Sequence, residues 1–230
     1  MNLPTASVMP FVDRTDAGRR LAERLVGLNL PDPVALALPR GGVPVAAEVA
    51  RALNAPLDLV IVRKLGMPGH AELAAGAIAD GDPPVRVLND TVLRMAGIGP
   101  ADLDPVIARE TAELARRRAA YLGAGPRLPL AGRSAIVIDD GIATGATMRA
   151  ALRAVRQAGP RRLILAVPVA PADVLADLAT EADEIICLLR PDPFLAVGAH
   201  YADFDQVSDD RVIAALTPPP AAGTPAQGSG

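Results

Sequence analysis

The chain has 230 residues, half of them apolar, so it can fold as one substantial domain that buries roughly 70% of its unfolded surface. The formal net charge of −3 provides no general attraction to nucleic acid. The single cysteine, Cys187, excludes an internal disulfide, and two histidines are too few for a zinc cluster at the usual spacings.

The N-terminal segment shows no basic region followed by an apolar core, and no apolar run approaches the ~18 residues that cross a bilayer. We therefore expect a soluble, cytoplasmic protein that binds neither membranes nor nucleic acid. A first helix is predicted from a cap at Thr15 or Asp16 to about Leu28.

Short apolar runs then alternate with amphipathic segments. The apolar runs predict strands at 34–38, 57–62, 74–79, 85–88, 135–138, 163–169 and 184–189. The amphipathic segments predict helices at 43–53, from 91, from 102 or 104 to 122, from 147 to the stop at 159–160, and after Pro171. Residues 63–70, with glycines, a proline and charges, are predicted to form a mobile loop. The alternation favours an α/β fold with a central parallel sheet flanked by helices.

One stretch, 135–147, joins a buried strand to two acids and a loop of small residues. Asp139 and Asp140 follow the strand directly, where open α/β sheets bind their ligands. The loop leads to Thr147, where a strongly amphipathic helix begins, and free N–H groups at a helix N-terminus can hold a phosphate. An isolated Asp-Asp-Gly is more often a solvated turn, but the loop and helix that follow favour carboxylates beside a phosphate site.

This stretch resembles the phosphoribosyl diphosphate (PRPP) binding motif of the type I phosphoribosyltransferases. The resemblance implies that Asp139 and Asp140 hold the ribose hydroxyls, with Mg²⁺ bound directly or through water. It also implies a loop that binds the 5-phosphate through Ala143, Thr144, Gly145, Ala146 and Thr147.

The same resemblance implies a fold in which a small hood stands beside the sheet. We expect a single domain at 1–216, with the hood built from about 1–20 and 190–212. The remaining residues, 217–230, are proline, alanine and glycine without periodicity, and we predict a disordered tail there.

Two other segments match the same family. Arg40, Gly41 and Gly42 are similar to its pyrophosphate loop, where bare glycine backbone lets N–H groups approach phosphate oxygens. Arg63 and Lys64, the latter being the only lysine of the chain, resemble the start of its catalytic loop. Taken alone, the first segment is more often a plain turn and the second a surface charge pair.

Acceptor recognition in this family depends on the hood. Phe194, Tyr201 and Phe204 cluster after the last predicted strand, where they would either stack on a planar base or fill the core of the hood. His200 lies beside them, as a ligand contact or a structural residue. The 6-oxopurine members carry an acid at the position of Ala143, so we expect a different acceptor, such as those of the adenine and uracil enzymes, which tolerate alanine there.

We therefore expect Mg²⁺-dependent transfer of 5-phosphoribosyl from PRPP to a nitrogen acceptor such as a nucleobase, with release of pyrophosphate, in nucleotide salvage. Asp139, Asp140 and Lys64 are the expected catalytic residues. The main alternative is a PRPP or nucleotide sensor on the same fold that regulates a partner without catalysis. A phosphatase with Asp139 as nucleophile is disfavoured, because the phosphate loop follows the acids. A homodimer is compatible with these predictions.

Overall fold

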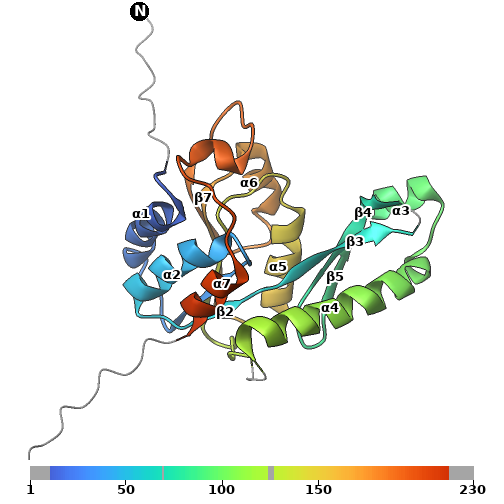
Figure 1. Ribbon diagram of the computed structural model, residues 1–230, viewed down its shortest axis with the longest axis horizontal. Helices are drawn as coiled ribbons and strands as arrows, with labels where there is room; N and C mark the ends of the chain where they lie inside the picture. Colours follow the sequence, from blue (N-terminus) through green and yellow to red (C-terminus); the bar gives the residue numbers. More distant parts are fainter. Residues whose placement is uncertain (1–10, 69, 124–126, 218–230) are drawn as a thin grey trace, which may run out of the picture.

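The computed structural model describes residues 11–68, 70–123 and 127–217, with side chains described outside 70–73. Its centre is a five-stranded parallel sheet in the order β2-β1-β6-β7-β8 (Figure 1). The strands are β1 (Pro33–Ala37), β2 (Leu57–Leu59), β6 (Ser134–Ile138), β7 (Arg162–Val169) and β8 (Glu184–Leu189). The predicted α/β fold with a central parallel sheet is confirmed. Most of the predicted tail, and the part of the predicted hood before Phe11, lie outside the described residues.

Successive residues of the central strands face opposite sides of the sheet, and each side has its own core. On one face the strands pack against α1 (Arg14–Val26), α2 (Gly42–Leu53) and α7 (Asp209–Leu216). On the other face they pack against α5 (Ala146–Gln157) and α6 (Ala172–Leu178). Because both faces are covered, the strand sequences are apolar at nearly every position.

An arm projects from one side of this body (Figure 1). It consists of β3 (Val62–Met67), β4 (His70–Ala79), β5 (Val85–Leu88), α3 (Asp90–Ala96), the 3₁₀ helix η1 (Pro100–Leu103) and α4 (Asp104–Leu122). The three strands form an antiparallel sheet, and the predicted turn at Asp80-Gly81 connects β4 to β5. Ala77 and Ala79 of β4 pack against Ala154 of α5, which attaches the arm to the body.

The mobile loop predicted at 63–70 is wrong. This segment forms β3, which pairs with β4 as far as Met67, with register shifts around Gly66. Leu65 and Met67 are buried, whereas Lys64, which directly precedes Leu65, is exposed. A two-residue alternation typical of a strand was therefore present among the glycines and charges.

The strand predicted at 57–62 is also wrong in its extent. β2 ends at Leu59, and the chain resumes as a strand only at Val62, now in the arm rather than in the central sheet. The apolar run is continuous because Val60 and Ile61, which link the two sheets, are buried as deeply as the strands.

Helix ends differ from the predictions in two places. α1 is capped by Asp13, whose carboxylate accepts from the N–H of Asp16 at 2.7 Å, and not by Thr15 or Asp16. α7 was not predicted, although Ser208 caps it and two acids occupy its first turn, which is a recognisable helix start. Because α7 has only 8 residues, its sequence shows little of the apolar periodicity by which helices are predicted.

The N-terminal end of the described chain meets the C-terminal segment 200–205 beside the sheet. Phe11 and Tyr201 form an isolated parallel bridge, and the N–H groups of Ala202 and Asp203 donate to the carbonyls of Phe11 and Val12 at 2.7 and 2.9 Å. Residues 11–13 and 200–205 therefore form one layer over the ends of β7 and β8.

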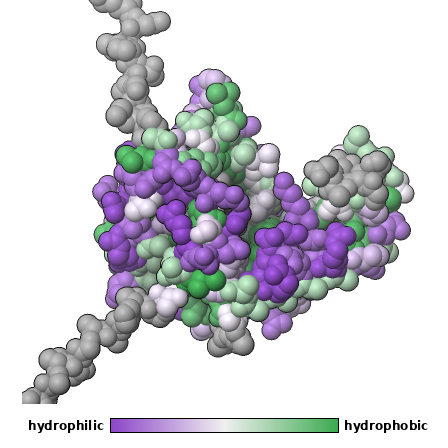
Figure 2. Space-filling model, viewed as in Figure 1, coloured by the Kyte–Doolittle hydropathy of each residue, from purple (hydrophilic) through white to green (hydrophobic). Residues whose placement is uncertain are grey.

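The face drawn in Figure 2 is mainly hydrophilic, with hydrophobic residues in small separate patches. The large exposed hydrophobic residues of the described chain belong to different elements; they are Val12, Val26, Met95, Leu195, Phe204 and Ile213. Within the described part of the chain, no helix has the length and apolar character needed to span a membrane.

Candidate active site

The acid pair lies where the fully buried strand β6 ends. The N–H of Asp140 donates to Oδ1 of Asp139 at 2.9 Å, so the two side chains are held next to each other. Burial raises the pKa of the Asp139 carboxyl well above its usual range, and the charge of Asp140 raises it further. Burial also raises the pKa of Asp140, although Arg14 opposes this change. Two partly desolvated carboxylates at a strand end are costly, which is typical of a functional site.

The loop after the acids leads directly into the N-terminus of α5. Ile142 anchors it, since this side chain is buried and its N–H donates to the carbonyl of Val169 at 2.9 Å. The next two residues, Ala143 and Thr144, are exposed. Gly145 caps the helix with φ +74°, and no side chain caps the first turn. The free N–H groups of this turn therefore point out of the helix end and can bind an anion.

A second loop, between β1 and α2, lies against the acid pair. β1 and β6 are parallel neighbours, with Ala37 opposite Ile138, so their loops leave the sheet side by side. A Cβ atom at Gly41 would overlap Oδ2 of Asp140, and one at Gly42 would lie 2.7 Å from the carbonyl oxygen of Ile138. Only glycine therefore permits this approach of the two loops. The peptide bond between Pro39 and Arg40 is cis.

The side chain of Arg40 extends from this loop towards α7. Its Nη1 lies 3.6 Å from Oδ1 of Asp209, which also accepts a 2.6 Å hydrogen bond from the hydroxyl of Tyr121. Both Arg40 and Asp209 are exposed by more than a third, so this ion pair is weak and leaves the guanidinium free to move.

Comparison with known proteins agrees with this arrangement of loops. Residues 13–194 match the family described as the phosphoribosyl transferase domain. The chain belongs to the phosphoribosyltransferase family. Two Mycobacterium tuberculosis proteins, "Putative phosphoribosyl transferase MT0597" of strain CDC 1551 / Oshkosh and "Putative phosphoribosyl transferase Rv0571c" of strain ATCC 25618 / H37Rv, are each 51% identical over 206 residues. These matches cover 90% of this chain but only 46% of each relative.

A solved structure has a similar sequence and the same fold. The crystal structure of TT1426 from Thermus thermophilus is 45% identical and superposes with a TM-score of 0.78, over 90% of this chain and 98% of that one. The resemblance to type I phosphoribosyltransferases noted in the sequence is therefore confirmed for the domain and its fold.

The two basic residues expected from the catalytic loop of this family lie on the arm. Arg63 donates from Nε to Oε2 of Glu110 on α4 at 2.8 Å, and it is thus engaged within the arm. Lys64 is exposed on the next position of β3 and makes no ion pair within the described part of the chain. The structure therefore does not bring Arg63 to the acid pair, and it leaves the ammonium of Lys64 accessible.

The three aromatic residues expected in the phosphoribosyltransferase hood have different surroundings. Tyr201 is buried against Phe11, with ring centroids 5.3 Å apart, and its hydroxyl donates to the carbonyl of Asp140 at 2.5 Å. Phe194 stacks on His200 at 5.7 Å. Phe204 is partly exposed and lies 5.0 Å from the ring of Tyr201. Tyr201 thus fills the core of this layer, while Phe194 and Phe204 are only partly buried.

Arg14 is a site residue that the sequence did not reveal. Its Nε donates to Oδ2 of Asp140 at 2.8 Å, although the two residues are 126 positions apart. The sequence shows only an arginine at the start of a helix, where a cation is unfavourable to the helix dipole. An arginine at a helix start was thus the one available signal, and it does not indicate which residue Arg14 would contact.

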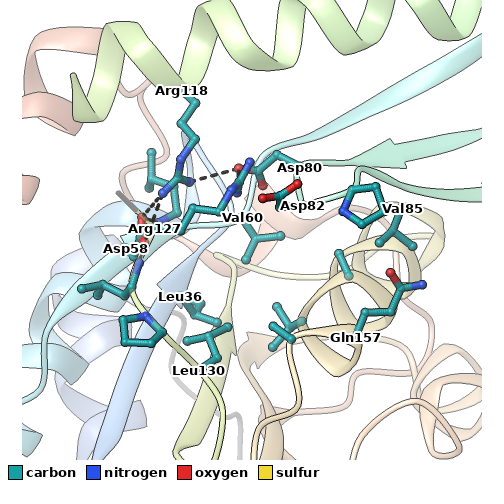
Figure 3. Close-up of a pocket in the computed structure, with 18 of the residues that line it drawn as sticks. Leu36, Asp58, Val60, Asp80, Asp82, Val85, Arg118, Arg127, Leu130 and Gln157 are labelled. Carbon is teal, nitrogen blue, oxygen red and sulfur yellow. Dashed lines mark hydrogen bonds and ion pairs between the residues drawn. The ribbon is translucent and has the colours of Figure 1, made fainter. Parts of the chain in front are cut away.

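A separate ionic cluster lies at the junction of the body and the arm (Figure 3). Arg118 of α4 contacts both Asp58 and Asp80, at 3.3 and 3.0 Å, and Arg127 contacts Asp80 at 2.5 Å. A cavity of about 470 Å³ adjoins the cluster and is also lined by the C-terminal end of α5. On α5 its lining begins at Ala154, roughly 12 Å along the helix from Ala146 at the loop that follows the acids. The charged groups of the cluster pair with one another, which is typical of a structural clamp; they are Asp58, Asp80, Arg118 and Arg127.

The residues present fit the Mg²⁺ that the family uses. Asp139 and Asp140 supply carboxylate oxygens, the ligand type that Mg²⁺ prefers, and Mg²⁺ commonly binds one or two carboxylates together with water and substrate phosphates. The described chain offers no cluster of three or more metal-binding side chains. The acid pair is therefore suited to share the ion with a bound substrate rather than to retain it alone.

Proposed function

We propose that this domain transfers the 5-phosphoribosyl group of PRPP to a nitrogen atom of a nucleobase acceptor. The observation that carries the proposal is the contact between the two loops, where Gly41 and Gly42 lie against Asp139 and Asp140. The contact makes the glycine loop a neighbour of the carboxylate pair, and the chain continues from that pair to the N-terminus of α5. PRPP is a ribose with phosphate groups at both ends, and it requires this combination.

In the proposed complex each part of the site binds one part of PRPP. The loop 143–147, in which Ala143, Thr144 and Ala146 are exposed, binds the 5-phosphate through N–H groups at the start of α5. Asp139 and Asp140 accept hydrogen bonds from the ribose hydroxyls and orient the sugar. The N–H groups of Gly41 and Gly42 bind the pyrophosphate, with Arg40 turning from its weak contact with Asp209.

The reaction breaks the bond between ribose C1 and a pyrophosphate oxygen, forms a bond between C1 and the acceptor nitrogen, and releases the proton of that nitrogen to solvent. Positive charge develops on the sugar ring while negative charge grows on the leaving pyrophosphate. Arg40 and Lys64 stabilise that leaving group electrostatically. When bound, Mg²⁺ would neutralise pyrophosphate charge further.

The proposed acceptor side is the layer formed by the chain ends, which serves as the hood. Phe194 and Phe204 are only partly buried, and their exposed atoms are available to contact a planar ring. Ala143 offers no carboxylate to the acceptor, which favours acceptors other than hypoxanthine and guanine.

The test is incubation of the protein with PRPP, Mg²⁺ and a panel of purines, pyrimidines and other amines, with pyrophosphate and product mass as readouts. We expect pyrophosphate and a ribosylated product with at least one nucleobase. If PRPP raises the melting temperature but no member of the panel yields pyrophosphate, a PRPP sensor would replace the proposed enzyme. If PRPP produces neither effect, the proposed site is wrong.

A further inference from the structure

Arg14 has three anchors, and two of them lie in the layer formed by the chain ends. Its Nε donates to Oδ2 of Asp140 at 2.8 Å, and its Nη1 donates to the carbonyl of Asp205 at 2.7 Å. Its guanidinium carbon lies 3.9 Å from the ring centroid of Phe204, within the range of a cation–π contact. The side chains of Arg14 and Asp140 are only 12% and 13% exposed. This ion pair is thus largely shielded from water, unlike the exposed pairs on the surface.

The same layer also holds Asp140 by a hydrogen bond to the backbone carbonyl of Asp140. The hydroxyl of Tyr201 donates to the Asp140 carbonyl at 2.5 Å, and Tyr201 is itself packed between Phe11 and Phe204. Asp140 is therefore held twice by residues that are distant in the sequence. The carboxylate of its neighbour Asp139 accepts a hydrogen bond from the adjacent N–H of Asp140.

We propose that Arg14 is a positioning residue for the PRPP site, which fixes the carboxylate of Asp140 and, by stacking on Phe204, couples the ribose site to the acceptor-side layer. The inference rests on the proposed PRPP site. It assigns to the start of α1 a part in donor binding, because an oriented carboxylate loses less freedom when it accepts a ribose hydroxyl.

The geometry favours positioning over competition between Arg14 and the ribose. A carboxylate has about four lone-pair directions, and Arg14 uses one of them, through Nε alone. Asp140 can therefore accept a ribose hydroxyl while Arg14 stays in place. Withdrawal of Arg14 would also break its contacts with Asp205 and Phe204, which makes it an unsuitable gate.

The experiment compares Arg14→Met, Arg14→Lys and Phe204→Leu with the wild type by calorimetric titration with PRPP and Mg²⁺, without acceptor. We expect Arg14→Met to raise the Kd for PRPP roughly tenfold, as for the loss of a charged hydrogen bond. Arg14→Lys keeps the charge but not the planar stack and should recover part of the affinity. Phe204→Leu should weaken binding of PRPP less than Arg14→Met does.

A matched control separates positioning from general stability. Arg118 is also 12% exposed and also bridges elements, but it lies in the clamp of Figure 3. Arg118→Met should lower the melting temperature and leave the Kd for PRPP within about twofold of the wild type. An equal loss of affinity in both variants would overturn the proposal, and so would tighter binding in Arg14→Met, which would identify a competitor.

A second measurement does not depend on PRPP. In hydrogen exchange of the unliganded protein, we expect the backbone of 139–145 to exchange faster in Arg14→Met and Arg14→Lys than in the wild type, and to be unchanged in Arg118→Met. Equal protection of this segment in all four proteins would contradict the inference. If the wild type fails to bind PRPP, the proposed function is wrong, and the exchange data still decide whether Arg14 orders Asp140.

Discussion

At the scale of single residues, Asp140 is the carboxylate with the most contacts in the site. It touches Gly41 and accepts from Arg14, and its carbonyl accepts from Tyr201. We predict that Asp140→Asn lowers turnover at least ~100-fold, the loss expected for one well-placed catalytic group. The fold should survive, because Asn preserves the shape of the side chain. Pyrophosphate release measures the first effect and circular dichroism the second; wild-type turnover in this variant would remove Asp140 from the mechanism.

The neighbouring acid, Asp139, is predicted to destabilise the unliganded fold when it is ionised. Because burial raises the pKa of Asp139, its ionisation costs stability. The cost is absent below the ordinary carboxyl pKa of 3.8, grows as the pH rises towards the raised pKa, and is constant above it. Asp139→Asn removes the charge and keeps an oxygen for the N–H of Asp140. We predict that it raises the melting temperature of the unliganded protein by about 2–4 °C at pH 7, as for ~1 kcal/mol. A scan in chelator at pH 7 checks this; a lower melting temperature would show that the charge is compensated.

At the scale of elements, the contact between the β1–α2 loop and the end of β6 depends on the absence of a side chain. In Gly42→Ala the new Cβ would lie 2.7 Å from the carbonyl oxygen of Ile138 and 2.9 Å from Cα of Asp139, both backbone atoms. We predict a loss of about 1–3 kcal/mol in the free energy of unfolding, as for overpacking, together with weaker binding of PRPP.

Gly27→Ala is the matched control for this substitution. Gly27 follows α1 with φ −71°, and the nearest atom to the methyl group that alanine would add is 4.0 Å away. It should be neutral or slightly stabilising. Urea denaturation compares the two variants, and equal effects would mean that the loop can yield.

The arm depends on an ion pair that links β3 to α4. Burial alone would raise the pKa of Glu110, but hydrogen bonds from Arg63 and Arg109 outweigh it and lower that pKa below its ordinary value of 4.5. The stabilisation is therefore present above about pH 4.5 and is lost as the pH falls through the lowered pKa.

We predict that Glu110→Gln costs about 1–3 kcal/mol at pH 7 and that its difference from the wild type shrinks towards pH 3. Glu113→Gln is the control, since the ion pairs of Glu113 with Arg116 and Arg117 are on the exposed face of the same helix and should matter little. Thermal unfolding at the two pH values measures both; a constant gap for Glu110→Gln would argue against an ionic contribution.

At the scale of the whole molecule, the site joins the ends of two central strands, the N-terminus of a helix and the layer of the chain ends. A ligand that bridges these parts should stabilise the entire domain. We predict that PRPP with Mg²⁺, at 100 times its Kd, adds about 2.7 kcal/mol and raises the melting temperature by about 5–10 °C. Ribose 5-phosphate and pyrophosphate each occupy part of the site and bind more weakly, so at the same concentration as PRPP they should have smaller effects. Equal shifts with all three would indicate binding at a single phosphate subsite.

The parallel sheet and most of its helices were predictable because their signals are local. A strand buried on both faces is apolar throughout, and the helices show their stripes and stops within a few residues. The motif from Asp139 to Thr147 could also be recognised, since a strand, acids, small residues and a helix follow one another without interruption. The adjoining loop at Gly41 and Gly42 could be inferred only by resemblance.

The tertiary structure decided the contacts between distant segments. Arg14 meets Asp140 across 126 positions, and the segment 63–67 becomes a strand because β4 offers it an edge with which to pair. An ion pair between distant residues has no local cause, since it depends on where two backbones pass. The strand has a local signal in the alternating burial of Leu65 and Met67, but its formation also depends on its partner strand. The sequence by itself determined the sheet, the acid pair and the phosphate loop, whereas packing of the chain ends alone placed Arg14, Tyr201 and Phe204 around Asp140.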